Sequence, residues 1–243
     1  MMVMDWKGDA ATAREVTERG FEIIHDGRTV PGIIWTPEET DSPSPVVLIG
    51  HGASGHKRQP HLLALARRLV RHHGIAAVAI DGPAHGDRVT ADGELTADER
   101  RSAMRDGTVI EDTITDWKAT LDATQALPEI GVGQVGYWGL SMGTIFGLPF
   151  VAREPRVQAA VLGLMGTGGF MGDTLLPYAA DIRCPVLFLQ QLDDELIPNE
   201  TGVALYESLA TGEKELHRNP GAHAAIPPAE FDHTEAFLAQ HLR

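Results

Sequence analysis

The chain has 243 residues, of which 43% are hydrophobic, and 34 acidic and 20 basic residues give it a formal net charge of −14. It is long enough to bury the core of one large domain, and its acidic balance argues against nucleic acid or an anionic membrane surface as a partner. A single cysteine, Cys184, excludes an intramolecular disulfide.

The start of the chain lacks the basic residues and the apolar run of a secretion signal. No segment approaches the roughly 20 apolar residues that a membrane span needs. We therefore expect a cytoplasmic protein.

Short apolar runs alternate with segments that favour helices along the chain. The first two runs, 21–25 and 29–35, flank Asp26-Gly27 and predict an antiparallel pair. Later runs predict buried strands at 45–50, 75–80, 135–138, 157–162 and 185–190, and a short strand near 213–217. The segments that favour helices are 61–73, 144–152, 201–209, 228–242 and a long one whose apolar face carries Ile110, Ile114, Trp117 and Leu121.

Continuous apolar strands alternating with helices are typical of a mostly parallel sheet that is covered on both faces. We predict one α/β domain over residues 1–243, with a short insertion at about 83–107 and no large lid domain. Ligands bind such sheets at the carboxyl ends of the strands, so the loops that follow the strands should carry the chemistry.

The most informative of these loops is Gly139-Leu140-Ser141-Met142-Gly143. It reads G-x-S-x-G and lies between a predicted strand and a predicted helix, the setting in which a serine hydroxyl is exposed at the tip of a sharp turn. The glycines allow a tight turn whose neighbours approach without a Cβ. The motif predicts a nucleophilic serine.

Other predicted loops follow the strands in chain order: His51-Gly52-Ala53 after the strand at 45–50, the segment 192–198 after the strand at 185–190, and the segment 219–223 after the last short strand. The last two contain Asp194 and His223. Ser141, Asp194 and His223 thus occur in the order Ser, Asp, His, which is that of α/β-hydrolase triads.

From about Phe21 to its C-terminus the chain resembles an α/β-hydrolase, and within that superfamily the dienelactone-hydrolase-related esterases. In that family the acid lies four residues before a proline, as Asp194 does before Pro198, and the histidine follows a small residue or glycine in a late loop, as in Gly221-Ala222-His223. Two departures stand out. Dienelactone hydrolases proper use a cysteine nucleophile where this chain has Ser141, and the usual glycine before the acid is Gln191.

The resemblance implies a serine hydrolase. A serine hydroxyl needs a base to remove its proton, which His223 can do, and Asp194 would orient His223 and stabilise its charged form. Two backbone N–H groups would bind the oxyanion: that of Met142, after the nucleophile, and that of Ala53 in the His51-Gly52-Ala53 turn.

Some assignments have rivals. Asp193 competes with Asp194, and the spacing to proline favours Asp194. His217 and His233 compete with His223, but only His223 follows a glycine in a loop after a strand.

Two segments flank the predicted site. The first, at 83–107, is charged and polar. The second follows the strand at 157–162 and is apolar and rich in glycine; it offers Met165, Phe170 and Met171 as walls of a small substrate pocket, or else as filling for the edge of the core.

We expect no cofactor. Eleven histidines could suggest a metal ion, but no pair has the spacing of an H-E-x-x-H site, so we expect none. The sequence thus predicts a hydrolase of small carboxylic esters that works through an acyl-enzyme. Acyl transfer, or cleavage of thioester, C–C or peptide bonds, would use the same triad, and a non-catalytic binding module is a further alternative. The sequence does not fix the oligomeric state.

Overall fold

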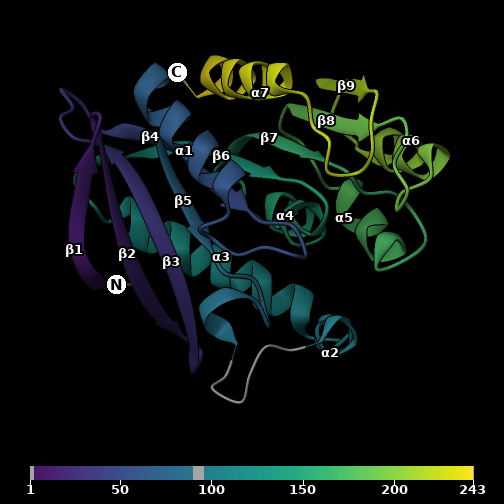
Figure 1. The fold of residues 1–243 in the computed structure, drawn as a ribbon, viewed down its shortest axis with the longest axis horizontal. Helices are drawn as coiled ribbons and strands as arrows, with labels where there is room; N and C mark the ends of the chain where they lie inside the picture. Colours follow the sequence, from purple (N-terminus) through teal and green to yellow (C-terminus); the bar gives the residue numbers. More distant parts are fainter. Residues whose placement is uncertain (1–2, 90–95, 243) are drawn as a thin grey trace.

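The computed structural model describes residues 3–89 and 96–242, and in these residues nine strands form one sheet (Figure 1). The strands are β1 (Asp5–Ala13), β2 (Val16–His25), β3 (Arg28–Pro37), β4 (Ser44–Gly50), β5 (Ala76–Ile80), β6 (Ile130–Gly139), β7 (Val157–Gly163), β8 (Val186–Gln191) and β9 (Lys214–Asn219). Their order across the sheet is β1-β2-β3-β5-β4-β6-β7-β8-β9. The first three strands and the pairing of β3 with β5 are antiparallel, and every other pairing is parallel.

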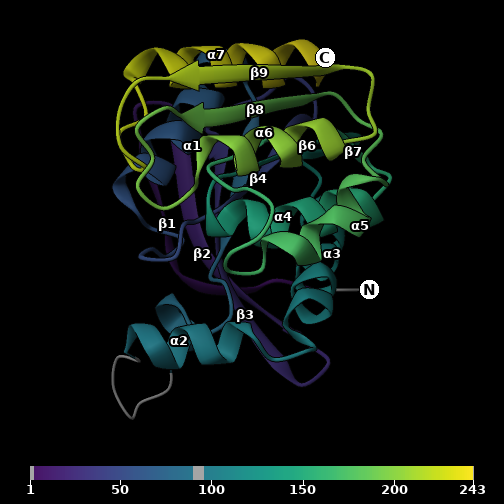
Figure 2. The ribbon, with the colours of Figure 1, turned by 90° about the vertical axis from the view of Figure 1, so that its right-hand side faces the viewer.

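The helices form a layer on each side of the sheet (Figures 1 and 2). They are α1 (Pro60–His73), α2 (Ala97–Met104), α3 (Val109–Gln125), α4 (Met142–Arg153), α5 (Leu176–Ala179), α6 (Asn199–Ser208) and α7 (Pro228–His241), with short 3₁₀ turns at Gly86–Arg88 and Gly172–Leu175. Two hydrophobic clusters fill the space between the sheet and the helices. One lies between the sheet and α1 and α7, and the other lies between the sheet and α3, α4, α5 and α6. The predicted α/β-hydrolase architecture is confirmed.

The parallel strands were predictable because both of their faces are buried, which makes them continuously apolar: every residue of β5 and of β8 is buried. Strand β1 was not predicted. Almost all of its residues are exposed, so it lacks the alternation of apolar and polar side chains that marks a half-buried strand.

The insertion expected at about 83–107 contains the turn Gly86–Arg88 and helix α2, while its residues 90–95 lie outside the described part of the chain. In the described residues no separate lid domain covers the sheet (Figure 1). None of the described helices is long and apolar enough to cross a membrane.

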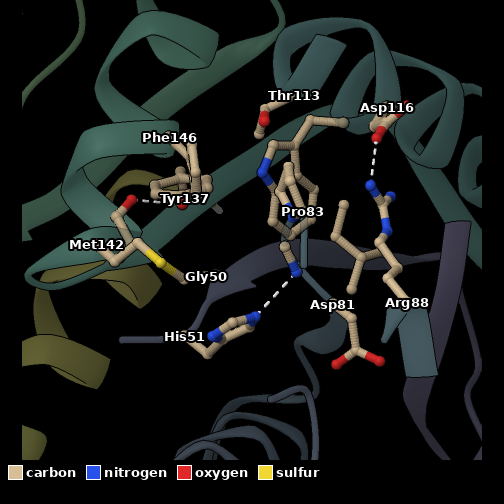
Figure 3. A pocket seen from close by; sticks show the side chains of 14 residues that line it. Gly50, His51, Asp81, Pro83, Arg88, Thr113, Asp116, Tyr137, Met142 and Phe146 are labelled. Carbon is tan, nitrogen blue, oxygen red and sulfur yellow. Dashed lines mark hydrogen bonds and ion pairs between the residues drawn. The ribbon is translucent and has the colours of Figure 1, made fainter. Parts of the chain in front are cut away.

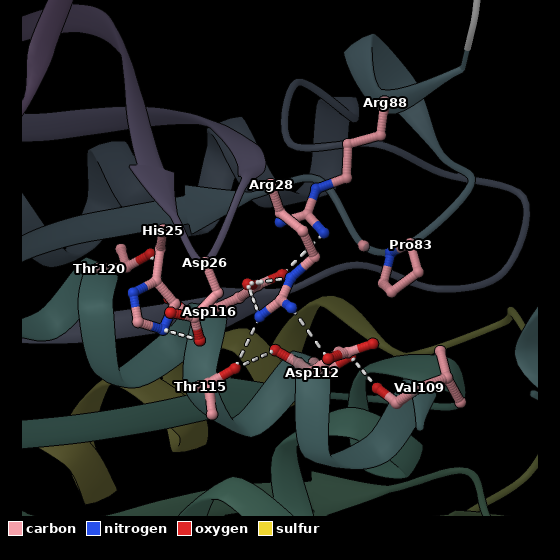
Figure 4. A network of polar contacts seen from close by, with 12 residues as sticks. His25, Asp26, Arg28, Pro83, Arg88, Val109, Asp112, Thr115, Asp116 and Thr120 are labelled. Carbon is pink, nitrogen blue, oxygen red and sulfur yellow. Dashed lines mark hydrogen bonds and ion pairs between the residues drawn. The ribbon is translucent and has the colours of Figure 1, made fainter. Parts of the chain in front are cut away.

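A buried ion-pair network holds the segment after β5 in place (Figure 4). Asp116 on α3 is 1% exposed, and its carboxylate lies 3.0 Å from Nη2 of Arg28 and 2.8 Å from Nη1 of Arg88. Arg28 begins β3 and also donates to Asp112 on α3, at 2.9 Å. One buried carboxylate therefore ties β3, α3 and the loop after β5 together.

Candidate active site

Ser141 lies at the turn between β6 and α4, with a left-handed φ of 58°. Such a backbone is rare for a residue other than glycine, and it marks the strained turn that exposes a nucleophilic hydroxyl. The glycines on either side permit close contacts. A Cβ on Gly139 would lie 2.7 Å from the Gly143 carbonyl oxygen, and one on Gly143 would lie 2.8 Å from the carbonyl oxygen of Gly50.

Hydrogen bonds to the end of β7 stabilise this turn. The Ser141 N–H donates to the Gly163 carbonyl oxygen at 2.9 Å. The buried hydroxyl of Thr144 accepts from the Gly163 N–H at 2.9 Å and lies within hydrogen-bond distance of the Gly139 and Gly163 carbonyls, at 2.9 and 2.7 Å. The strained turn is therefore held by the neighbouring strand as well as by its own helix.

The three residues expected to form a triad lie in one hydrogen-bonded chain. His223 Nε2 is 2.9 Å from Ser141 Oγ, and His223 Nδ1 is 2.7 Å from Asp194 Oδ2. The side chain of Asp194 is 3% exposed and that of His223 is 12% exposed. The second oxygen of Asp194 accepts from the N–H groups of Leu196 and Ile197, at 2.8 and 2.9 Å, which fixes the carboxylate.

Neighbours of Asp194 hold the segment that carries His223. Asp193 accepts from the Gly221 N–H at 2.9 Å, and no hydrogen bond of the described structure joins it to His223, so it stabilises the loop. Glu195 accepts from the His223 N–H at 3.0 Å, and this hydrogen bond lowers the pKa of its carboxyl. The buried amide of Gln191 donates to the Ala225 carbonyl at 2.7 Å, which gives the residue that replaces the usual glycine a structural part in the same loop.

The two other candidate histidines, His217 and His233, lie against Glu230. His217 Nδ1 lies 3.0 Å from Glu230 Oε2, and His233 Nδ1 lies 3.4 Å from Glu230 Oε1. Neither histidine contacts Ser141 in the described structure, so the geometry favours His223 as the base.

The backbone N–H groups of Ala53 and Met142 have no hydrogen-bond acceptor in the described part of the chain. Met142 is the first residue of α4, so its N–H lies at the positive end of the helix dipole. These are the two donors expected to bind the oxyanion.

His51 orients the first of these donors. Its Nε2 accepts from the Gly82 N–H at 2.9 Å, so Nδ1 carries the proton and donates to the Gly52 carbonyl at 2.8 Å. That carbonyl belongs to the same trans peptide unit as the Ala53 N–H and points away from it. Burial lowers the pKa of His51 to about 4, which keeps the ring neutral, as these contacts require.

Further hydrogen bonds and an ion pair stabilise the His51-Gly52-Ala53 turn. His85 Nε2 lies 2.8 Å from the Ala53 carbonyl oxygen. Asp81 is fully buried, accepts from the Lys57 N–H at 2.9 Å and forms an ion pair with the Lys57 ammonium, which also lies 2.6 Å from Asp87 Oδ2. The loops after β4 and β5 therefore form one braced unit.

Beside this unit lies a cavity of about 20 Å³, room for roughly one water molecule (Figure 3). The residues that line it include His51, Gly82, Met142, Phe146 and Trp117.

None of the three expected pocket residues lines that cavity. Met165 is 5% exposed and belongs to the hydrophobic core, while Phe170 and Met171 are half-buried and pack against the core. The Arg105 guanidinium lies 5.4 Å from the centre of the Phe170 ring. Their part in binding substrate stays a prediction.

Comparison with known proteins identifies the family of this chain. Residues 30–227 match the family model described as "Dienelactone hydrolase family". The chain belongs to the dienelactone hydrolase family.

Solved structures of an esterase are similar to this chain along its length. A structure described as a PEG-bound complex of a novel cold-adapted esterase from an Arctic intertidal metagenomic library is 42% identical, covers 99% of this chain and 100% of that one, and superposes with a TM-score of 0.89. A zinc-bound structure with the same esterase description is 39% identical over 99% of this chain and 100% of that one, with a TM-score of 0.85.

A curated relative matches over a shorter region. The quorum-quenching protein AidA of Acinetobacter baumannii (strain MDR-ZJ06) is 28% identical over 131 residues, which are 54% of this chain. The match covers only 38% of the length of that relative.

Proposed function

We propose that this protein is a serine hydrolase that cleaves carboxylic esters with small acyl or alcohol groups through an acyl-enzyme intermediate. The observation that carries the proposal is the hydrogen-bonded chain from Asp194 through His223 to Ser141. Membership of the dienelactone hydrolase family and the likeness to an esterase at 42% identity support it.

In the first half of the reaction, Ser141 Oγ attacks the ester carbonyl carbon while its proton passes to His223 Nε2. The negative charge that develops on the carbonyl oxygen is bound by the N–H groups of Ala53 and Met142, and Asp194 stabilises the imidazolium. His223 then gives the proton to the alcohol oxygen, the C–O bond breaks, and the acyl group stays on Ser141.

In the second half, water takes the place of the alcohol. His223 removes a proton from the water, the resulting oxygen nucleophile attacks the acyl carbon, and the bond to Ser141 Oγ breaks as the proton returns to that oxygen. The carboxylic acid leaves and the free serine is restored. Losing one oxyanion donor typically costs about 3 kcal/mol of transition-state stabilisation.

Esters are the preferred substrate class because the esterase neighbour matches along its whole length. The same groups could serve thioester, C–C or peptide cleavage or acyl transfer, and no contact in the described structure favours one of these over ester hydrolysis. A single domain over residues 1–243, a cytoplasmic location and the lack of a nucleic-acid partner stay predictions from the sequence.

The proposal is tested with p-nitrophenyl acetate, butyrate, octanoate and palmitate. We expect kcat/KM to be highest for acetate or butyrate, and Ser141→Ala to lower turnover by about 10⁴-fold or more. Ser208→Ala is the matched control, because that hydroxyl donates within its own helix, to the Leu205 carbonyl. Turnover that survives in Ser141→Ala would place the nucleophile elsewhere, and a preference for palmitate would contradict a small site.

A further inference from the structure

Three metal-ligating side chains meet at a place that the proposed reaction does not use. His217 comes from strand β9, and Glu230 and His233 come from the first turns of helix α7, which lies directly along that strand (Figure 2). We call these three residues the β9–α7 cluster. The sequence did not reveal it, because Glu230 and His233 are only three positions apart and their partner is on a different element.

The spacing of the ligand atoms fits a zinc ion. Zinc binds nitrogen and oxygen at about 2.0–2.1 Å in a tetrahedral arrangement, which places neighbouring ligand atoms about 3.3 Å apart. In the cluster, Glu230 Oε1 lies 3.3 Å from His217 Nδ1 and 3.4 Å from His233 Nδ1, and one ligand atom from each residue lies within 4.8 Å of the others.

The buried carboxylate of Glu230 also favours binding of a cation at the cluster. Glu230 has a side-chain exposure of 6%, and its ion-pair partners in the described structure are His217 and His233, with no lysine or arginine. A buried carboxylate needs compensating partners, and Glu230 lies in the first turn of α7. A divalent cation bound by the three side chains supplies such a partner.

A second histidine–glutamate group gives a useful contrast. Glu235 lies near His72 and His73, but its carboxylate oxygens are already held by Arg68, at 2.6 and 3.2 Å. A metal ion there would have to displace a guanidinium. Among the described residues, no lysine or arginine pairs with Glu230 of the β9–α7 cluster.

We propose that His217, Glu230 and His233 bind one Zn²⁺ ion, with water as the fourth ligand on the side where His233 is exposed. Glu215 lies 3.6 Å from the other ring nitrogen of His217. It therefore occupies the place of the outer carboxylate that commonly orients a zinc-bound histidine.

The bound ion joins the two ends of a segment that matters for the proposed reaction. Residues 218–229 run from β9 to α7, and His223 lies near the middle of them. An ion that links His217 to Glu230 and His233 closes this segment at its base and stabilises the folded state over the unfolded one. The ion serves structure and takes no part in the chemistry at Ser141.

The test is isothermal titration of ZnCl₂ into chelator-treated protein without an oligohistidine tag. We expect one equivalent to bind, and the Tm to rise by about 5–10 °C when free Zn²⁺ is 100-fold above Kd. His217→Ala and His233→Ala should both abolish this equivalent and the Tm shift. His72→Ala, at the second group, should keep both.

His233 is more than half exposed, so His233→Ala is expected to fold and to keep its ester hydrolysis. That separates failure of the zinc site from failure of the proposed function. No zinc binding by the wild-type protein, or an equivalent that persists in His233→Ala, overturns the proposal. An equivalent lost in His72→Ala would place the ion at the second group and overturn it as well.

Discussion

The imidazole of His51 must stay neutral to make the contacts that the structure gives it. Its two ring nitrogens serve as one acceptor and one donor, and together they fix the peptide unit that presents the Ala53 N–H. Protonation would turn the acceptor, Nε2, into a second donor facing the Gly82 N–H. His51 is a positioning residue, because it acts through the peptide and not on the substrate.

A pH dependence of stability follows. Burial lowers the pKa of His51 in the folded protein to about 4, against 6.5 for an exposed histidine. Between these values the unfolded chain binds more protons, so the free energy of unfolding falls as the pH falls from 6.5 towards 4, by up to about 3 kcal/mol, and is fully retained above pH 6.5. Urea unfolding across this range measures it.

The matched variant is His51→Gln, which cannot titrate here. Its free energy of unfolding should fall less than that of the wild-type protein over the same pH range. Equal slopes for the two proteins would show that His51 is not the group responsible.

At the residue scale the sequence was a good guide to groups recognised by a local motif. Ser141, Asp194 and His223 each lie in a short pattern, and the structure brings the three together. The parts that the sequence missed depend on distant contacts. The bond from His51 to Gly82 crosses between two loops, and the meeting of His217 with Glu230 depends on how α7 packs on β9.

Among the elements, helix α4 packs unusually close to the sheet. Gly147 faces Tyr137 of β6, whose fully buried hydroxyl donates to the Gly143 carbonyl at 2.8 Å. Burial of this ring also raises the pKa of the Tyr137 hydroxyl. The closeness of helix and strand helps to hold the start of α4, and with it Ser141, against the sheet.

Gly147→Ala should therefore be destabilising, because its Cβ would lie 2.0 Å from Tyr137 Cε1. We expect a loss of about 1–3 kcal/mol in the free energy of unfolding, measured in urea. Gly212→Ala is the control: a Cβ there meets nothing within 4 Å, and it should change stability by no more than about 0.5 kcal/mol. Equal effects of the two substitutions would contradict the close packing.

Two elements differ in how clearly the sequence predicts them. Strand β1 is exposed and carries no apolar pattern, so only its pairing with β2 defines it. Helix α2 did carry a readable signal, because Thr96 and Glu99 form a capping box. Met165 illustrates a third case: an apolar residue in a loop looks the same whether it lines a pocket or fills the core.

For the molecule as a whole, Asp116 joins parts that are far apart in the chain. It is buried between Arg28 and Arg88 and so links the antiparallel strands to the loop beside the active site (Figure 4). Removing one partner of a buried ion pair leaves the opposite charges uncompensated, at a cost of about 3–5 kcal/mol. Asp116→Ala should show a loss of this size in urea unfolding.

The control is Asp122→Ala. Asp122 pairs with Arg156 on the surface at 2.7 Å and its side chain is 51% exposed, so its removal should cost about 0–1 kcal/mol. A loss for Asp116→Ala as small as that of the control would show that the network is not needed for stability.

The central claim is that Ser141 is a nucleophile activated by His223. The most direct measurement is to incubate the folded protein with a serine-directed organophosphonate and to locate the added mass by peptide mass spectrometry. We predict a single phosphonylated residue, Ser141, and much slower labelling in His223→Ala. A label on another serine, or no label on folded wild-type protein, would contradict the claim.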